Sequence, residues 1–255
     1  MNNNITKLDP ISLEIIANGL RSITDECFAA LMRSAYSTNI KERHDHSIAI
    51  IDNQGRLVVQ SALSLPIHIS SMSGLMQYVL KKFGDNIEEG DIFIANDPHT
   101  AGGSHLPDIN YAMPIFYEGD LIAFICNIAH HADIGGMVPG SMAGGMSSIY
   151  QEGLRIPVMK LFRRGELQTD IMDLLLLNVR APEERRGDHN AQIAACKLGA
   201  KRFNEVIKVH GIVNVLTAFN EIITRTAQRM RAAFKEIPDG TYLFEDYMDG
   251  DGISS

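Results

Sequence analysis

Histidines and carboxylates gather beside glycines in the segment from Asn96 to Gly136. The side chains of interest there are His105, Asp108, His130, His131 and Asp133. Imidazole and carboxylate groups are ligands of divalent zinc, manganese and iron. A fold that brings several of them together would form a metal site, which is typical of hydrolysis or Lewis-acid chemistry.

Two of these residues lie at matching positions of a predicted β-hairpin. We expect strands over 109–116 and 121–129, joined by a short turn. Counted outward from the turn, the two strands are nearly equal in length, so Asp108 and His130 should lie close together across the pair. The alternative is that they are ordinary loop residues that cap or hydrogen-bond. The spacing favours a shared metal site.

Two more side chains are candidates for the same site. Pro107 excludes a regular helix around His105, which therefore lies on a constrained loop three residues before Asp108. Asp45 lies between a predicted helix and a predicted strand. It either supplies a fourth ligand or belongs to a solvated turn, and the sequence leaves both open.

Proton transfer would need further groups beside the ligands. Glu152 follows a glycine-rich loop over 135–153 and is a candidate base or a partner of a ligand. His131 follows His130 directly, and successive side chains of a strand point to opposite faces. His131 then either orients a group of the site or contacts a partner. We therefore name Glu152 and His131 as candidate catalytic residues.

Composition narrows the class of protein. The 255 residues are enough for a sizeable core, with 45% hydrophobic and 21% charged residues. A net charge of −8 without a dense basic cluster argues against a nucleic-acid partner. The longest apolar runs are too short to span a membrane. Three distant cysteines and a polar N-terminus favour a reducing, cytoplasmic location without disulfides.

Several common nucleotide and hydrolase motifs are missing from the sequence. It has no phosphate-binding P-loop, no G-x-G-x-x-G after a strand, no G-x-S-x-G elbow and no His-Glu-x-x-His. Any nucleotide chemistry would therefore come from another polypeptide or from an unusual fold.

The secondary structure expected around these residues indicates an α+β fold, with an antiparallel sheet between helices. Asp9-Pro10 begins a long amphipathic helix that should end near Ser37. A hairpin is expected around 52–55, and a second helix should begin at Ser70 or Ser71 and end at Phe83. A short buried strand is expected over 91–95.

The last third of the sequence is predicted to be mostly helical. We expect helices over 170–178, 183–210 and 212–235, a turn at Pro238–Gly240 and a strand over Thr241–Met248. A single terminal strand needs neighbours. The sequence therefore suggests a truncated gene or one half of a split protein.

Six stretches along the chain, in order, resemble the hydantoinase B/oxoprolinase family. They are DPISLEIIANGL, SxNIKERxD (Ser37–Asp45), NDPHTAGGSHLPDI, AHHADIGGMVPGS, YQEGLRIPVMKL and NVRAPEERRGDHNAQIAA. Together they cover nearly the whole chain. The resemblance implies one family domain over 1–255, with the metal loop and sheet at about 40–165 and the helical region at about 170–236.

The resemblance also implies a division of labour between subunits. A hydantoinase A-type partner with an ATPase fold would bind ATP and phosphorylate the substrate, a hydantoin, 5-oxoproline or related lactam. The B-type chain would hold zinc or manganese and direct water onto the activated amide. The family's metal ligands fall on His105, Asp108 and His130, with Asp45 as a further ligand. A hetero-oligomer is expected.

Two other functions remain open at this point. The family also includes subunits of acetone and acetophenone carboxylases, whose metal loop has the same motifs. The abrupt end of the chain also permits a non-catalytic fragment or assembly module, which would retain no metal. Members of the family continue beyond the point where this sequence stops.

Overall fold

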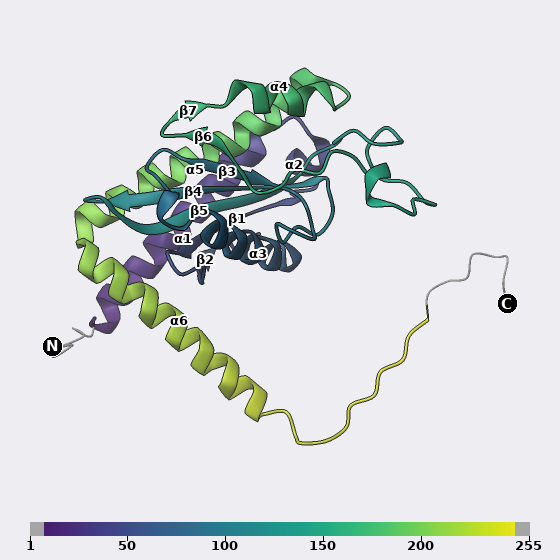
Figure 1. Cartoon of the computed structure of the whole chain (residues 1–255). Coiled ribbons are helices and arrows are strands. Elements are labelled where there is room, and N and C mark those ends of the chain that lie inside the picture. The colour runs from purple at the N-terminus through teal and green to yellow at the C-terminus, as the bar shows by residue number, and fades with distance from the viewer. Residues whose placement is uncertain (1–7, 248–255) are drawn as a thin grey trace.

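A computed structural model describes residues 8–247 and shows one antiparallel sheet between two layers of helices (Figure 1). The strand order is β2-β1-β5-β4-β3-β6-β7, and every neighbouring pair is antiparallel. The strands are β1 (His46–Asp52), β2 (Leu57–Gln60), β3 (Ile92–Ala95), β4 (Asp108–Tyr117), β5 (Asp120–His130), β6 (Met159–Arg163) and β7 (Glu166–Leu167). The predicted α+β class is confirmed.

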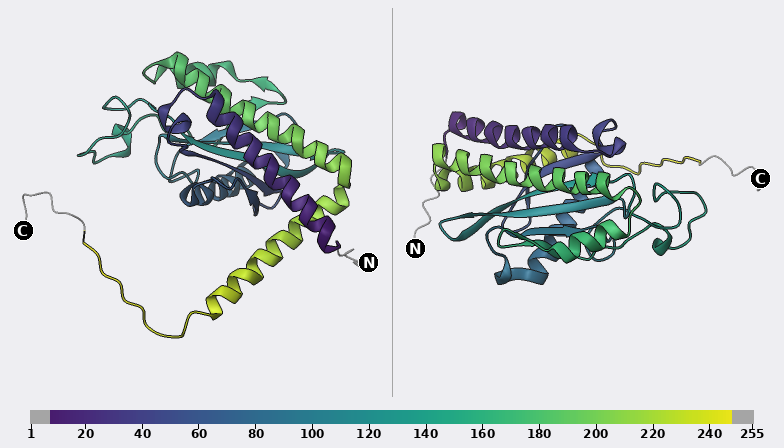
Figure 2. Two further views of the ribbon diagram at one scale, coloured as in Figure 1. Left: turned by 180° about the vertical axis from the view of Figure 1, so that it is seen from behind. Right: turned by 90° about the horizontal axis from the view of Figure 1, so that it is seen from above.

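Two long helices cover one face of this sheet. They are α1 (Pro10–Ser34) and α5 (Pro182–His210), which lie side by side over the strands (Figure 2). Asp9 caps α1 by accepting from the backbone N–H groups of Ile11 and Ser12, as the sequence predicts. The larger of the two buried apolar clusters fills this interface, because the apolar stripe of each helix faces the sheet.

A single helix, α3 (Pro66–Phe83), covers the other face. It begins four residues before Ser70, so the predicted start at Ser70 or Ser71 is wrong. Pro66 takes the first helical position, where its fixed φ suits a helix and its missing N–H costs no hydrogen bond. This earlier start adds one turn, and that turn contains His68.

The first helix also differs from its predicted end. It stops at Ser34, and the short α2 (Thr38–Lys41) follows. Asp188 on α5 accepts hydrogen bonds from the backbone N–H groups of Tyr36 and Ser37, at 2.7 and 2.9 Å. A carboxylate from a distant helix therefore fixes the chain between α1 and α2.

The last elements are α4 (Thr169–Leu177) and α6 (Ile212–Lys235), with 3₁₀ turns η1 (Gly84–Asn86) and η2 (Ile149–Gln151) earlier in the chain. The second half of α6 extends away from the sheet (Figure 1). No strand forms over 241–247, so the predicted strand is wrong there, because no sheet edge lies beside it to pair with. Met248 lies outside the described residues.

The described residues contain no single helix long and apolar enough to cross a membrane. Taken together, α5 and α6 reach that length and composition, but the chain bends by 108° between them. Cys27, Cys126 and Cys196 are all free and buried.

Candidate metal centre

The centre of the candidate site is the open end of the β4–β5 hairpin. Asp108 begins β4, His130 ends β5, and the two are direct cross-strand partners. One carboxylate oxygen of Asp108 lies 3.3 Å from His130 Nδ1. The proximity that the strand lengths predict is therefore confirmed.

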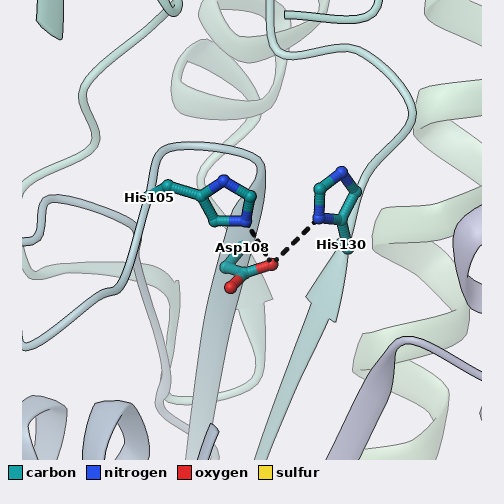
Figure 3. Close-up of side chains that lie close together, drawn as sticks. All are labelled: His105, Asp108 and His130. Atoms are coloured by element: carbon teal, nitrogen blue, oxygen red, sulfur yellow. Dashed lines mark ion pairs between the residues drawn. The ribbon is translucent and has the colours of Figure 1, made fainter. Parts of the chain in front are cut away.

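His105 approaches the same carboxylate from the loop before β4 (Figure 3). Its Nε2 lies 3.1 Å from Asp108 Oδ1, and its ring centroid lies 4.9 Å from that of His130. The Asp108 side chain is 4% exposed, whereas that of His105 is 35% exposed. The cluster is thus buried at the carboxylate and open to solvent at His105.

Asp45 reaches the cluster because β1 pairs with β5. Its backbone carbonyl accepts from His130 N–H at 3.0 Å, which ties the residue before β1 to the end of β5. Asp45 Oδ2 then lies 3.5 Å from His130 Nδ1. The structure places Asp45 beside His130, so Asp45 stays a candidate fourth ligand.

His68 is part of the cluster, although the sequence alone does not identify it. Its Nε2 lies 3.4 Å from Asp45 Oδ1 and 3.7 Å from Asp108 Oδ2. It stands on α3 among apolar residues, where a lone histidine is ordinarily a core residue. No local pattern marks it, because only the packing of α3 on the sheet brings it to the site.

These side chains line an open cavity of about 430 Å³. Its lining consists of Asp45, Ile67, His68, Ser104, His105, Asp108, His130 and Met142. Glu152 lines a second cavity of about 200 Å³, which His105 and Met142 share with the first. A small molecule entering the larger cavity would therefore meet the cluster on one side and the loop before Glu152 on another.

The cluster is arranged to keep its carboxylate ionised and His68 neutral. Burial tends to raise the pKa of Asp108, but the adjacent imidazoles of His105 and His130 outweigh it and hold that pKa well below its usual value. Asp108 in turn raises the pKa of His105 against the effect of burial. Burial lowers the pKa of His68 despite Asp108 and Asp45 nearby. Metal ligation requires an ionised carboxylate and neutral imidazole.

The donor set fits a divalent cation. Asp108 Oδ1 is buried and receives no hydrogen bond of acceptable geometry, although two imidazole nitrogens lie within 3.3 Å. A buried carboxylate oxygen without a donor is costly unless a cation satisfies it. The ligand atoms of His105, Asp108 and His130 all lie within 4.8 Å of one another. Mixed imidazole and carboxylate ligation suits zinc or manganese and does not choose between them.

His131 faces away from this centre. It is fully buried, its Nε2 lies 2.8 Å from Gln192 Oε1, and its ring packs 4.7 Å from that of His189. Both of those residues are on α5, on the opposite side of the sheet from α3. The structure does not bring His131 to the cavity, because alternate side chains of a strand point to opposite faces, and we assign it a packing role.

Asp133 also lies outside the ligand cluster. Its carboxylate accepts hydrogen bonds from the backbone N–H groups of Gly135 and Gly140 and from Arg180. It therefore fixes the glycine-rich loop. Gly136 has a φ of +82°, and a Cβ there would collide with the carbonyl oxygen of Gln151. The loop is thus folded closely against itself before it reaches Glu152.

Comparison with known proteins identifies the family of this chain. A model of the family described as hydantoinase B/oxoprolinase matches residues 9–255. The chain belongs to the hydantoinase B/oxoprolinase family. It is 34% identical over 251 residues to the B-type subunit of a putative D-/L-hydantoinase from Pseudomonas sp. (strain NS671), covering 96% of this chain and 42% of that one.

Two solved structures share the fold of this family member. The ATP-dependent caprolactamase from Pseudomonas jessenii matches with a TM-score of 0.85 and 33% identity, over 94% of this chain and 42% of that one. An acetone carboxylase, solved without nucleotide, matches with a TM-score of 0.86 and 24% identity, over 93% of this chain and 32% of that one. The second likeness shows the fold alone. The chain spans about two fifths of the length of its hydantoinase and caprolactamase relatives.

Proposed function

We propose that this chain is the metal-binding part of an ATP-dependent cyclic-amide hydrolase that acts on a hydantoin, 5-oxoproline or a related lactam. The observation that supports this most is the buried Asp108 carboxylate between His105 and His130, in an open cavity. Family relatives named hydantoinase and caprolactamase support the substrate class.

Within this proposal, His105, Asp108, His130 and Asp45 hold the ion. A divalent zinc or manganese ion bound there would supply Lewis-acid chemistry and lower the pKa of a water molecule toward neutrality. Glu152 lines the adjoining cavity beside His105, from where its carboxylate would orient that water or accept its proton. Ser104 donates a 2.5 Å hydrogen bond to Asp108 Oδ2 and thereby restrains the carboxylate.

ATP would be used on a partner subunit of the hydantoinase A type. The hydantoinase and caprolactamase relatives are each named as one subunit of their enzyme, which indicates enzymes of more than one component. The sequence of this chain contains no P-loop or dinucleotide-binding motif. We therefore expect a hetero-oligomer in which the partner phosphorylates the lactam and this chain presents the water that opens the ring.

Metal analysis tests the centre directly. The purified chain would be incubated with zinc or manganese, dialysed and analysed for bound metal beside a His105→Ala/Asp108→Ala double variant. We expect at least one equivalent of metal per chain in the parent and its loss in the double variant. A His99→Ala variant serves as the control, because His99 is an exposed histidine outside the cavity lining.

The activity is then tested with the ATPase partner present. Lactam-dependent ATP hydrolysis that His105→Ala abolishes while complex assembly persists would support the proposal, and full activity in that variant would refute it. Bicarbonate-dependent ATP hydrolysis with acetone or acetophenone would favour the carboxylase alternative. Failure of the parent to retain metal would favour a non-catalytic fragment.

A further inference from the structure

His68 is held in a fixed orientation at the edge of the cluster. Its Nδ1 lies 2.9 Å from the hydroxyl of Ser47, and that hydroxyl oxygen also accepts from the backbone N–H of Leu65 at 2.9 Å. Ser47 and His68 are both buried. A hydroxyl oxygen can accept two hydrogen bonds, so Nδ1–H can donate to Ser47 and leave the lone pair of Nε2 facing the carboxylates.

The carboxylates of Asp108 and Asp45 each direct one oxygen toward His130 and the other toward His68. Asp108 directs Oδ1 toward His105 and His130 and Oδ2 toward His68. Asp45 directs Oδ2 toward His130 and Oδ1 toward His68. A carboxylate with one oxygen facing His68 and the other facing the histidines on the opposite side is arranged like a ligand that bridges two metal ions.

The contacts of His68 are longer than hydrogen bonds. Its Nε2 lies 3.4 and 3.7 Å from the nearest oxygens of Asp45 and Asp108, beyond the usual range of about 2.7–3.2 Å for an N–H donor. Ligand atoms that each lie about 2.0–2.2 Å from one ion are instead separated by roughly 3.0–4.2 Å. The ligand atoms of Asp45, His68 and Asp108 all lie within 4.8 Å of one another.

We propose that Asp45, His68 and Asp108 form a second divalent-cation subsite, which shares its carboxylates with the His105–Asp108–His130 subsite. Ser104 also donates to Asp108 Oδ2, and a carboxylate oxygen retains a second lone pair beside one hydrogen bond. Ions in such paired sites lie about 3.5–4 Å apart, a spacing that one bridging carboxylate spans.

The second subsite gives the cavity a preference for an anionic substrate group. Two divalent ions carry four positive charges, whereas Asp45 and Asp108 supply two negative charges. The surplus is matched by the dianionic phosphate of a phosphorylated lactam, the substrate class of the proposed function on which this step rests. Asp45 is 31% exposed and borders the cavity, so such a group has access to this side.

The number of ions bound per chain tests the second subsite. The parent would be saturated with manganese, freed of excess ion and analysed for bound metal. Electron paramagnetic resonance would follow the magnetic coupling between neighbouring ions. We expect two equivalents and a coupled signal in the parent, one equivalent and an uncoupled signal in His68→Ala, and the parental result in His99→Ala.

A second variant preserves the test if His68→Ala does not fold. Ser47→Ala retains His68 but removes the partner of its Nδ1, and we expect the second equivalent to bind roughly 10- to 100-fold more weakly.

One equivalent of metal in the parent, or two in His68→Ala, would overturn the second subsite and leave the proposed function standing. Loss of all metal in a folded His68→Ala would also overturn it, by showing one shared centre. No metal in the parent would overturn the proposed function as well.

Discussion

Buried histidines in this chain serve two different purposes, and their partners distinguish them. His68 and His130 present ring nitrogens to carboxylates at 3.3–3.7 Å, around an open cavity. His46 and His131 instead lie within the packed core, where their ring nitrogens pair with the Phe28 carbonyl and with Gln192 Oε1. Burial is the largest influence on both and lowers the pKa of each, although Asp188 opposes this effect at His131.

The pH dependence of stability should reflect His46. It stacks on Phe28 with centroids 3.8 Å apart and donates from Nε2–H to the Phe28 carbonyl. Burial lowers the pKa of His46 from 6.5 to about 4. The unfolded chain therefore takes up this proton first as the pH falls below 6.5. The stability from neutral His46 is complete above pH 6.5 and is lost progressively down to about pH 4, at up to about 1.4 kcal/mol per pH unit.

The variant His46→Phe retains the stacking and removes this titration. Urea unfolding of the parent and the variant between pH 8 and pH 4.5 should give a shallower decline for the variant. At pH 8 the free energy of unfolding of the variant should be lower than that of the parent by about 1 kcal/mol, because the hydrogen bond to the Phe28 carbonyl is lost. If the free energy of unfolding declined equally with pH in the parent and the variant, His46 would have no part in the loss of stability at acid pH.

At the scale of elements, α5 is joined to the sheet by polar contacts as well as by apolar packing. The Nε2 amide of Gln192 donates to the Ile109 carbonyl at 2.8 Å and to Asn127 Oδ1 at 2.9 Å. Its Oε1 lies 2.8 Å from His131 Nε2. These contacts hold β4 and β5 in register beneath the helix, near the hairpin end that forms the candidate metal centre.

Replacing Gln192 by Leu should destabilise the fold strongly. The substitution leaves several buried polar groups without partners, each of which costs about 1–3 kcal/mol. We expect a loss of about 3 kcal/mol in the free energy of unfolding, measured by urea titration at pH 7. Gln228→Leu, at an exposed position of α6, is the matched control and should change stability by less than about 0.5 kcal/mol. Equal effects of the two variants would contradict this account.

At the scale of the whole molecule, α6 differs from the other long helices. Its buried residues are confined to Val215, Ala218 and Phe219, while Met230 and Phe234 are 55% and 63% exposed. These two residues share one side of the helix with Ile223 and Ala227, at a spacing of three and four residues. The stripe is half-buried at Ile223 and Ala227 and exposed at Met230 and Phe234, so within the described residues the core covers only its first part.

The stripe should contribute little to folding and more to association. The double variant Met230→Gln/Phe234→Gln keeps helix-forming residues and should change the free energy of unfolding by no more than about 0.5 kcal/mol. Sedimentation velocity at rising concentration should show less self-association than in the parent. A stability loss of several kcal/mol would show that these side chains pack within the fold.

The features that depend on local periodicity and turn geometry could be predicted from the sequence alone. The long first helix, the α5 and α6 helices and the β4–β5 hairpin follow from such patterns. The turn brings the two strand ends together, so the proximity of Asp108 and His130 could be predicted from residue counts. A β-bulge at Ile115/Phe116 shifts the register by one residue and makes the two direct partners. The family motifs added Asp45 to this set.

The rest of the site depends on the packing of elements that are distant in the sequence. His68 joins the cluster because α3 crosses the sheet face, and the packing of a helix on distant strands leaves no periodic signal near one histidine. The opposite facing of His130 and His131 follows from strand geometry, but only the packing of α5 on that face buries His131 against Gln192. The strand expected after residue 240 did not form over 241–247, because strand propensity requires a free sheet edge and the fold places none there.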